Sequence, residues 1–147
     1  MMLGTRLRIP ADVARIAEVR QAVREVAEAN DAHPSCLDDL VQAVDEAATN
    51  VIVHGYAGVA RGDLDIAVER VGEDIVITLE DRAPAYDPTT LPEPDLSIPP
   101  EHRRPGGMGV HLMRAAMDRI EHRPRPGGGN ILTMTRRLER RSKEGGA

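Results

Sequence analysis

The segment Asp45-Glu46-Ala47-Ala48-Thr49-Asn50-Val51-Ile52-Val53-His54 places polar side chains at regular intervals within an otherwise aliphatic run. Glu46, Asn50 and His54 are each four residues apart, so a helix puts them on one face. A carboxylate and an amide oxygen one helical turn apart suit a hard cation such as Mg²⁺, held directly or through water. Taken alone, the same spacing also fits the solvated polar face of an amphipathic helix.

This segment belongs to the second of two helices predicted in the first part of the chain. Apolar residues follow the helical period over 36–54, with Ser35 as the expected N-cap and Gly55 as the expected end. Asp12 is the expected N-cap of the preceding helix. The full pattern predicts helices over 12–29, 36–54 and from 106–109 to about 117, and strands over 3–9, 64–69, 75–80, 119–122 and 130–135.

The stretch over 83–105 contains seven prolines and cannot keep regular structure for long. Structureless stretches of this length inside a compact domain are usually functional loops, so we expect a lid here. The helices and strands around it are grouped rather than strictly alternating, which predicts an α+β two-layer sandwich. We expect one domain over 1–138, followed by a charged, frayed tail over 139–147.

The composition limits the class of protein. The chain has 147 residues, enough for one domain with its own core, and its net charge of −5 argues against nucleic-acid binding. Cys36 is the only cysteine, which excludes a disulfide framework, and Tyr56 and Tyr86 are the only aromatic residues, which predicts an aliphatic core. No apolar run reaches the roughly 18 to 20 residues that cross a bilayer. We therefore expect a cytoplasmic protein with no membrane partner.

Two further segments carry candidate binding residues. Asp81 closes an aliphatic strand, where its carboxylate can accept a hydrogen bond from an exocyclic amine; a turn-starting Asp is the alternative. Gly106-Gly107-Met108-Gly109 opens a helix, where backbone N–H groups and the helix dipole favour phosphate oxygens. Arg103 and Arg104 precede it and can add positive charge. A flexible linker with a glycine cap is the alternative for this segment.

Better-known nucleotide signatures are absent from the sequence. The chain has no Gly-x-x-x-x-Gly-Lys-Ser/Thr loop, which excludes a P-loop NTPase. Leu112 stands where the third glycine of a dinucleotide-binding motif is required. The five histidines do not pair at metal-binding spacings.

Together and in this order, the three segments resemble the Bergerat-type ATP-binding fold of the GHKL superfamily, which includes gyrase and the histidine kinases. The stretch over 46–56 is similar to its N box, Asp81-Arg82-Ala83 to its first glycine box, and Gly106-Gly107-Met108-Gly109-Val110 to its second. The resemblance is greatest to the anti-sigma factor serine/threonine kinases and covers nearly the whole chain. It implies a mixed, mainly antiparallel sheet with helices on one face.

The resemblance also implies residue roles. Glu46 would be the general base for a substrate serine or threonine hydroxyl, Asn50 would hold Mg²⁺ at the ATP phosphates, and Asp81 would bind the adenine amine. Ala83 stands where the family usually has glycine, a change that is compatible with binding if the backbone φ stays negative. The implied nucleotide contacts are Asn50, Asp81, Ala83, Arg104, Gly106, Gly107, Met108, Gly109 and Val110.

The function implied by the resemblance is that of a Mg²⁺-ATP-dependent serine/threonine kinase that doubles as an anti-sigma factor. It would bind a sigma factor, phosphorylate a STAS-type antagonist and form a homodimer. One alternative is a nucleotide-gated binding protein of the same fold that transfers no phosphate. A catalytic fragment of a histidine kinase is less well supported, because the residues before Glu46 contain one histidine, His33, in a predicted loop.

Overall fold

A computed structural model describes residues 4–90, 96–99, 101 and 107–142 of the chain. The strands are β1 (Gly4–Pro10), β2 (Asp63–Val71), β3 (Asp74–Asp81), β4 (Arg119–Pro124) and β5 (Asn130–Arg137). The helices are α1 (Ile16–Ala29), α2 (Pro34–Thr49) and α3 (Gly107–Ala116), with short helical turns η1 (Val13–Arg15), η2 (Asn50–Gly55) and η3 (Pro88–Thr90). Every predicted helix and strand is present, with small shifts at the ends.

The five strands form one open sheet in the order β1-β2-β3-β5-β4. All four pairings between these strands are antiparallel, so the expectation of a mixed sheet is wrong in that detail. The connection from β3 through α3 to β4 does produce two strands that run in the same direction. Because β5 lies between them, these two strands are not hydrogen-bonded neighbours.

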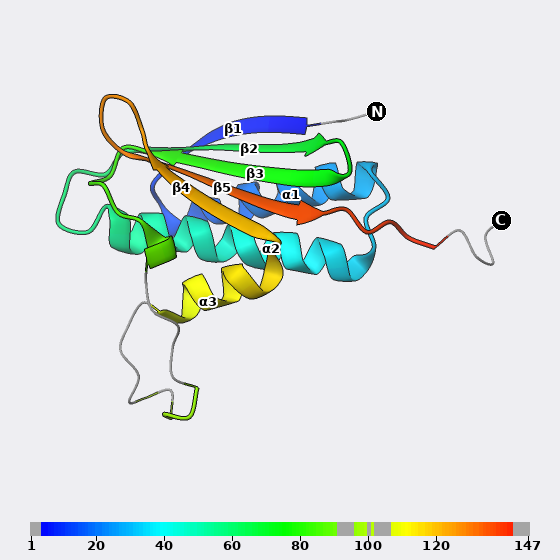
Figure 1. The fold of residues 1–147 in the computed structure, drawn as a ribbon. Coiled ribbons are helices and arrows are strands. Elements are labelled where there is room, and N and C mark those ends of the chain that lie inside the picture. The colour runs from blue at the N-terminus through cyan, green and yellow to red at the C-terminus, as the bar shows by residue number, and fades with distance from the viewer. Residues whose placement is uncertain (1–3, 91–95, 100, 102–106, 143–147) are drawn as a thin grey trace.

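The three helices cover one face of the sheet and leave the other open (Figure 1). Residues of the strands alternate between the faces, and those facing the helices are almost fully buried. The largest of them are the aliphatic residues Ile9, Leu64, Ile66, Ile75, Ile77, Leu79 and Met134. The predicted α+β two-layer sandwich with an aliphatic core is therefore confirmed.

The N-caps of the first two helical segments are Asp12 and His33, of which the sequence predicts only Asp12. The Asp12 carboxylate accepts a hydrogen bond from Ala14 N at 2.9 Å, as an N-cap does. The second helix begins earlier than predicted, because Pro34 occupies its first turn and His33 is the N-cap. Nδ1 of His33 accepts from Ser35 N at 3.1 Å, so the expectation that Ser35 is the cap is wrong.

Helix α2 continues without a break into η2, which is a π-helical turn that ends at the predicted Gly55. Tyr56 N donates to Val51 O at 3.0 Å, the five-residue spacing of such a turn. The wider turn changes the direction of the side chains after Asn50. His54 is exposed, whereas Glu46 and Asn50 are half-buried, so His54 does not share their environment.

None of the helices in the described part of the chain combines the length and the apolar composition needed to cross a bilayer.

Candidate functional site

A small cavity lies where the end of α2 and η2 meet the end of β3. It brings together Asn50 and Asp81, two residues that the sequence placed in separate candidate segments. Its volume of about 20 Å³ is close to that of one water probe. The lining residues are Ala47, Asn50, Val51, Gly55, Asp81, Tyr86, Pro88, His122, Asn130 and Leu132.

Asp81 is the last residue of β3 and is 3% exposed. Its Oδ1 accepts hydrogen bonds from Ala83 N and from Asn130 Nδ2, both at 2.9 Å. In the part of the chain that the structure describes, no hydrogen bond reaches Oδ2. Burial raises the pKa of this carboxyl, and the hydrogen bonds from Asn130 and Ala83 partly oppose the rise. A buried carboxylate with one oxygen held and the other available is suited to accept a hydrogen bond from a ligand.

Ala83 packs behind the cavity rather than into it. The residue is 2% exposed and forms a small apolar cluster with Ala11 and Tyr56. A Cβ built on Gly55 would lie 3.4 Å from the Ala83 methyl, in ordinary contact. Among the described non-glycine residues only Asp31 has a positive φ, so the condition set for Ala83 by the sequence is met. The methyl group therefore leaves the cavity open.

Tyr56 is a supporting residue that the sequence patterns do not identify. Its hydroxyl donates to Asp63 O and accepts from Arg82 N, both at 2.9 Å, which ties the start of β2 to the end of β3. A Cβ on Gly62 would lie 2.8 Å from this hydroxyl, so glycine leaves the space for it. A buried tyrosine in a chain with two aromatic residues is a weak signal that could have drawn attention to it.

Asn130 is the second residue that sequence reasoning missed. It begins β5 directly opposite Asp81 in the sheet register and is 6% exposed. Its Oδ1 accepts from Tyr86 N at 2.9 Å and lies 2.8 Å from Nε2 of His122. Forty-eight residues separate Asp81 from Asn130 in the chain, so only the strand order reveals the pair.

Glu46 lies on α2 next to the first turn of α3. A Cβ built on Gly109 would lie 3.0 Å from Oε2 of Glu46, so the two predicted site residues are neighbours. Oε1 of Glu46 accepts from Gln42 Nε2 at 3.2 Å. Burial raises the pKa of Glu46, the charge of Asp45 adds to the rise, and the Gln42 hydrogen bond lowers it. A carboxylate with a raised pKa is suited to take up a proton.

The other predicted site residues are divided between described and undescribed parts of the chain. Arg103, Arg104 and Gly106 lie outside the described residues. Gly107 and Met108 form the beginning of α3. Val110 is 3% exposed, and its side chain packs α3 against the hydrophobic core.

The donor set near α2 fits a magnesium ion that also binds phosphate. In the described ranges, no three His, Cys, Asp or Glu side chains are grouped as they would be in a site built by protein alone. Mg²⁺ commonly uses one or two side-chain oxygens and takes its other ligands from phosphates and water. Asn50, one turn after Glu46, offers an amide oxygen of this kind beside the cavity.

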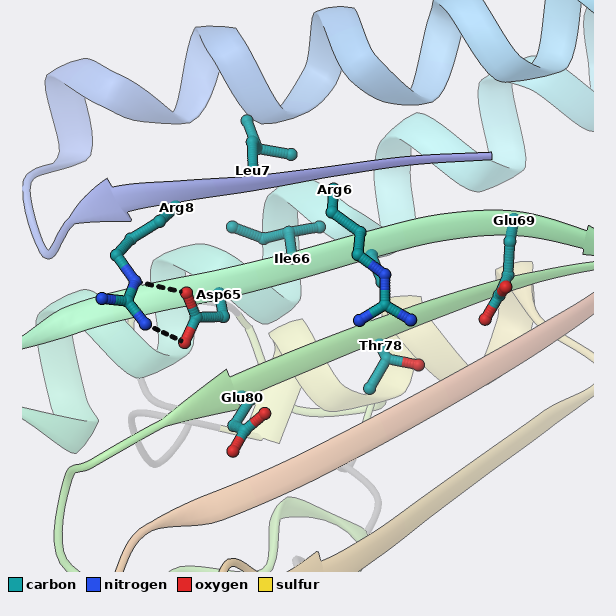
Figure 2. Close-up of a pocket in the computed structure, with 9 residues that line it drawn as sticks. Arg6, Leu7, Arg8, Asp65, Ile66, Glu69, Thr78 and Glu80 are labelled. Atoms are coloured by element: carbon teal, nitrogen blue, oxygen red, sulfur yellow. Dashed lines mark hydrogen bonds and ion pairs between the residues drawn. The ribbon is translucent and has the colours of Figure 1, made fainter. Parts of the chain in front are cut away.

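A larger hollow of about 490 Å³ lies on the open face of the sheet (Figure 2). Charged side chains of β1, β2 and β3 line it. Within the hollow Arg8 binds Asp65 at 2.6 Å, and Glu80 binds Arg125, which lies between β4 and β5, at 2.7 Å. Neither Glu46 nor Asp81 lines this hollow, so it is not part of the candidate site.

Comparison with known proteins gives a consistent result. The family profile described as "Histidine kinase-like ATPase domain" matches residues 9–136. An anti-sigma F factor of Pasteuria penetrans is 31% identical over 105 residues, covering 70% of this chain and 69% of that protein. The serine/threonine-protein kinase BtrW of Bordetella bronchiseptica is 29% identical, covering 65% and 67%. The serine-protein kinase RsbW of Bacillus cereus is 27% identical, covering 78% and 74%.

A solved structure supports the fold. The chain aligns with the crystal structure of the RsbU and RsbW domains of Rv1364c from Mycobacterium tuberculosis with a TM-score of 0.64 and 23% identity. The match covers 94% of this chain and about a third of that one, 34%. The profile over most of the chain and the anti-sigma F factor relative confirm the predicted resemblance. The chain belongs to the histidine kinase-like ATPase domain family.

Proposed function

We propose that this chain is a Mg²⁺-ATP-dependent serine/threonine protein kinase that also acts as an anti-sigma factor. In this role it holds a sigma factor and phosphorylates the antagonist protein that would release it. Relatives that carry the names anti-sigma F factor and serine-protein kinase support both halves of the proposal. We further propose that it works as a homodimer in the cytoplasm, with an antagonist of the STAS type.

One observation carries the proposal: three segments far apart in the sequence meet at one place. Asn50 and Asp81 line the same cavity, and Glu46 lies against Gly109 at the start of α3. A polar helix face, a turn aspartate or a glycine cap alone has an ordinary structural explanation. Their meeting along the last turns of α2, with Asp81 facing Asn50 and Gly109 beside Glu46, supports a nucleotide site.

The adenine base would bind at Asp81. The carboxylate is held through Oδ1 by Ala83 N and Asn130, which leaves Oδ2 to accept from the exocyclic amine. The small volume of the cavity means that an adenine ring needs the segment carrying Tyr86 and Pro88 to move outward. Binding of the base is therefore coupled to the beginning of the proline-rich stretch, the stretch that the sequence predicts to be a lid.

The phosphates would lie at the N-terminus of α3. Backbone N–H groups of Gly107 and Gly109 begin this helix, whose dipole favours an anion there. Asn50 would hold Mg²⁺, which when bound neutralises charge on the phosphate oxygens. A side chain at Gly109 would crowd Glu46, so glycine keeps the space between helix and carboxylate open.

Glu46 would act as the general base. It removes the proton from the serine or threonine hydroxyl of the antagonist as that oxygen forms a bond to the γ-phosphorus, and the bond from the γ-phosphorus to the β,γ-bridging oxygen breaks to release ADP. Its raised pKa suits this proton transfer, because a base is most effective when its pKa is near the working pH.

The test is transfer of labelled γ-phosphate from Mg²⁺-ATP to purified STAS-type proteins of the source organism. We expect one of them to be labelled on a serine or threonine. Glu46→Gln lowers the rate by about 10²- to 10⁴-fold, the usual contribution of a general base, and leaves the Kd for ATP nearly unchanged. Asp81→Asn is the matched variant for Glu46→Gln, because we expect it to lose ATP binding rather than to slow the transfer step alone.

Each other outcome excludes part of the proposal. If the chain binds ATP and a sigma factor but labels no antagonist, the nucleotide-gated binding protein replaces the kinase. If calorimetry detects no binding of Mg²⁺-ATP by the unmodified chain, both functions are excluded.

A further inference from the structure

The buried amide of Asn130 connects Asp81 with the backbone of residues 83–86. Nδ2 donates to Asp81 Oδ1 at 2.9 Å, to Pro84 O at 3.2 Å and to Ala83 O at 3.4 Å. Oδ1 accepts from Tyr86 N at 2.9 Å. The orientation of the amide is therefore fixed, because a backbone N–H requires an oxygen facing it and a carboxylate requires a nitrogen facing it.

This orientation also determines the role of His122. Its Nε2 lies 2.8 Å from Asn130 Oδ1, and an amide oxygen can only accept, so Nε2 carries the hydrogen. His122 therefore holds the amide oxygen of Asn130, while Asp81 accepts from the amide nitrogen. Asn130 cannot rotate without breaking contacts on both sides.

We propose that Asn130 is a positioning residue that sets the preference of this site for adenine over 6-oxopurines. The proposal rests on nucleotide binding as proposed above and concerns which base the site accepts. Asn130 engages Oδ1 of Asp81 and so fixes the rotation of the carboxylate. Oδ2 is then the oxygen that a base meets in the cavity.

The hydrogen bond that Asn130 donates to Asp81 determines which groups of a base the carboxylate can bind. A carboxylate that receives two N–H donors is stabilised in its ionised form, which can only accept. An ionised carboxylate accepts from the 6-amino group of adenine and repels the 6-oxo group of hypoxanthine or guanine. Loss of the Asn130 donor removes one of the groups that hold down the pKa of Asp81. A protonated Asp81 can donate to a 6-oxo group, so discrimination falls.

The experiment measures the Kd of Mg²⁺-ATP and of Mg²⁺-ITP by calorimetry. ITP differs from ATP by a 6-oxo group in place of the 6-amino group. We expect the unmodified chain to prefer ATP, and Asn130→Ala to reduce the ratio of the two Kd values on the order of tenfold, the effect of one hydrogen bond to a charged group. Most of the change comes from weaker ATP binding.

A matched control separates positioning from general stability. Tyr56→Phe also removes two buried hydrogen bonds at the end of β3 but does not touch the Asp81 carboxylate. We expect it to lower the melting temperature and to keep the ATP-to-ITP ratio. If Asn130→Ala does not fold, Asn130→Asp keeps the shape and the oxygen for Tyr86 N, and is expected to reduce the ratio in the same direction.

An unchanged ratio of the Kd values for ATP and ITP in a folded Asn130 variant overturns the inference. An equal reduction of this ratio in Tyr56→Phe also overturns it. Both results leave the proposed nucleotide site intact as long as the unmodified chain binds ATP. Failure of the unmodified chain to bind either nucleotide refutes the proposed function instead.

Discussion

The two ends of the candidate site are built differently. At the sheet end, Asp81, Ala83, Tyr56 and Asn130 are all less than 7% exposed, and hydrogen bonds fix the carboxylate, the amide and the hydroxyl. At the helix end, Glu46 and Asn50 are half-buried. The described hydrogen bond to the Glu46 carboxylate comes from the exposed side chain of Gln42.

This difference indicates that the two ends contribute differently to nucleotide binding and to catalysis. If the sheet end binds the base as proposed, its hydrogen-bonded side chains lose little conformational entropy on binding, and the outward movement of Tyr86 and Pro88 is the main rearrangement there. On the proposed function, the helix end would gain its order from the phosphates, the metal and the protein substrate. Variants at the sheet end should therefore change base binding or stability, and Glu46 variants at the helix end should mainly change catalysis.

The largest expected effect comes from Gly129→Ala. Gly129 has a φ of 116°, and a Cβ there would clash with the Asp81 carbonyl oxygen and lie 2.8 Å from Arg82 Cα. Because the obstacle is backbone, we expect a loss of about 3 kcal/mol in the free energy of unfolding from strain and overpacking. ATP binding should be lost with it. Chemical denaturation and calorimetry measure both.

Gly128→Ala is the control for this prediction. Gly128 has a φ of 109° but nothing within 4 Å of its Cβ position. Only the cost of the left-handed backbone applies, about 1 kcal/mol. Equal losses in the two variants would show that the contact with Asp81 has no special importance.

Asp81→Asn should separate binding from stability within the sheet end. We expect ATP affinity to fall at least about tenfold, since a hydrogen bond to a charged group contributes about 1.5–3 kcal/mol. Burial raises the pKa of Asp81 in the folded chain. At a pH below the ordinary carboxyl pKa, Asp81 is protonated in both the folded and the unfolded chain. As the pH rises through the raised pKa of the folded chain, the free energy of unfolding falls. The variant should therefore melt no lower than the unmodified chain at neutral pH, with a difference that shrinks in acid. A lower melting temperature at pH 7 would contradict this account.

Two neighbours of Glu46 should shift the pH dependence of phosphate transfer in opposite directions. Asp45 raises the pKa of Glu46 through its charge, and Gln42 lowers it through a hydrogen bond. Asp45→Asn should move the acidic limb of kcat/KM to lower pH, and Gln42→Leu should move it to higher pH. Each is the control for the other, and shifts in the same direction would argue against Glu46 as the titrating base.

The smallest effect is expected for Ala83→Gly. Removing a buried methyl and adding a flexible residue should lower the free energy of unfolding by about 1–2 kcal/mol. ATP affinity should stay within about twofold, because the methyl does not line the cavity. A tighter nucleotide complex in this variant would mean that the methyl restricts the base after all.

Helices and strands that depend on the local pattern of apolar and polar residues were predicted correctly from the sequence. Alternation marked β2 and β3, helical spacing marked α2, and glycines marked the start of α3. The stretch with Glu46 and Asn50 was identified because a helix converts regular spacing into a shared face. The phosphate-binding role of Arg104 and Gly106 stays a prediction, since these residues lie outside the described part of the chain.

What the sequence missed depends on contacts between distant segments. Nothing near Asn130 in the chain indicates that it faces Asp81, because that contact exists only once β5 pairs with β3. The same pairing makes the sheet wholly antiparallel. The His33 cap was missed for a local reason: the first turn begins at Pro34, ahead of the serine that propensity favours.

The two tyrosines have a practical consequence. Tyr86 lines the cavity, whereas Tyr56 is buried behind it with its hydroxyl held on both sides. The chain contains no tryptophan and no other aromatic side chain that emits appreciably in the ultraviolet. The intrinsic fluorescence of the protein therefore comes from these two side chains, and we expect a change on adding nucleotide to come mainly from Tyr86, so that no added label is needed to follow movement at the cavity.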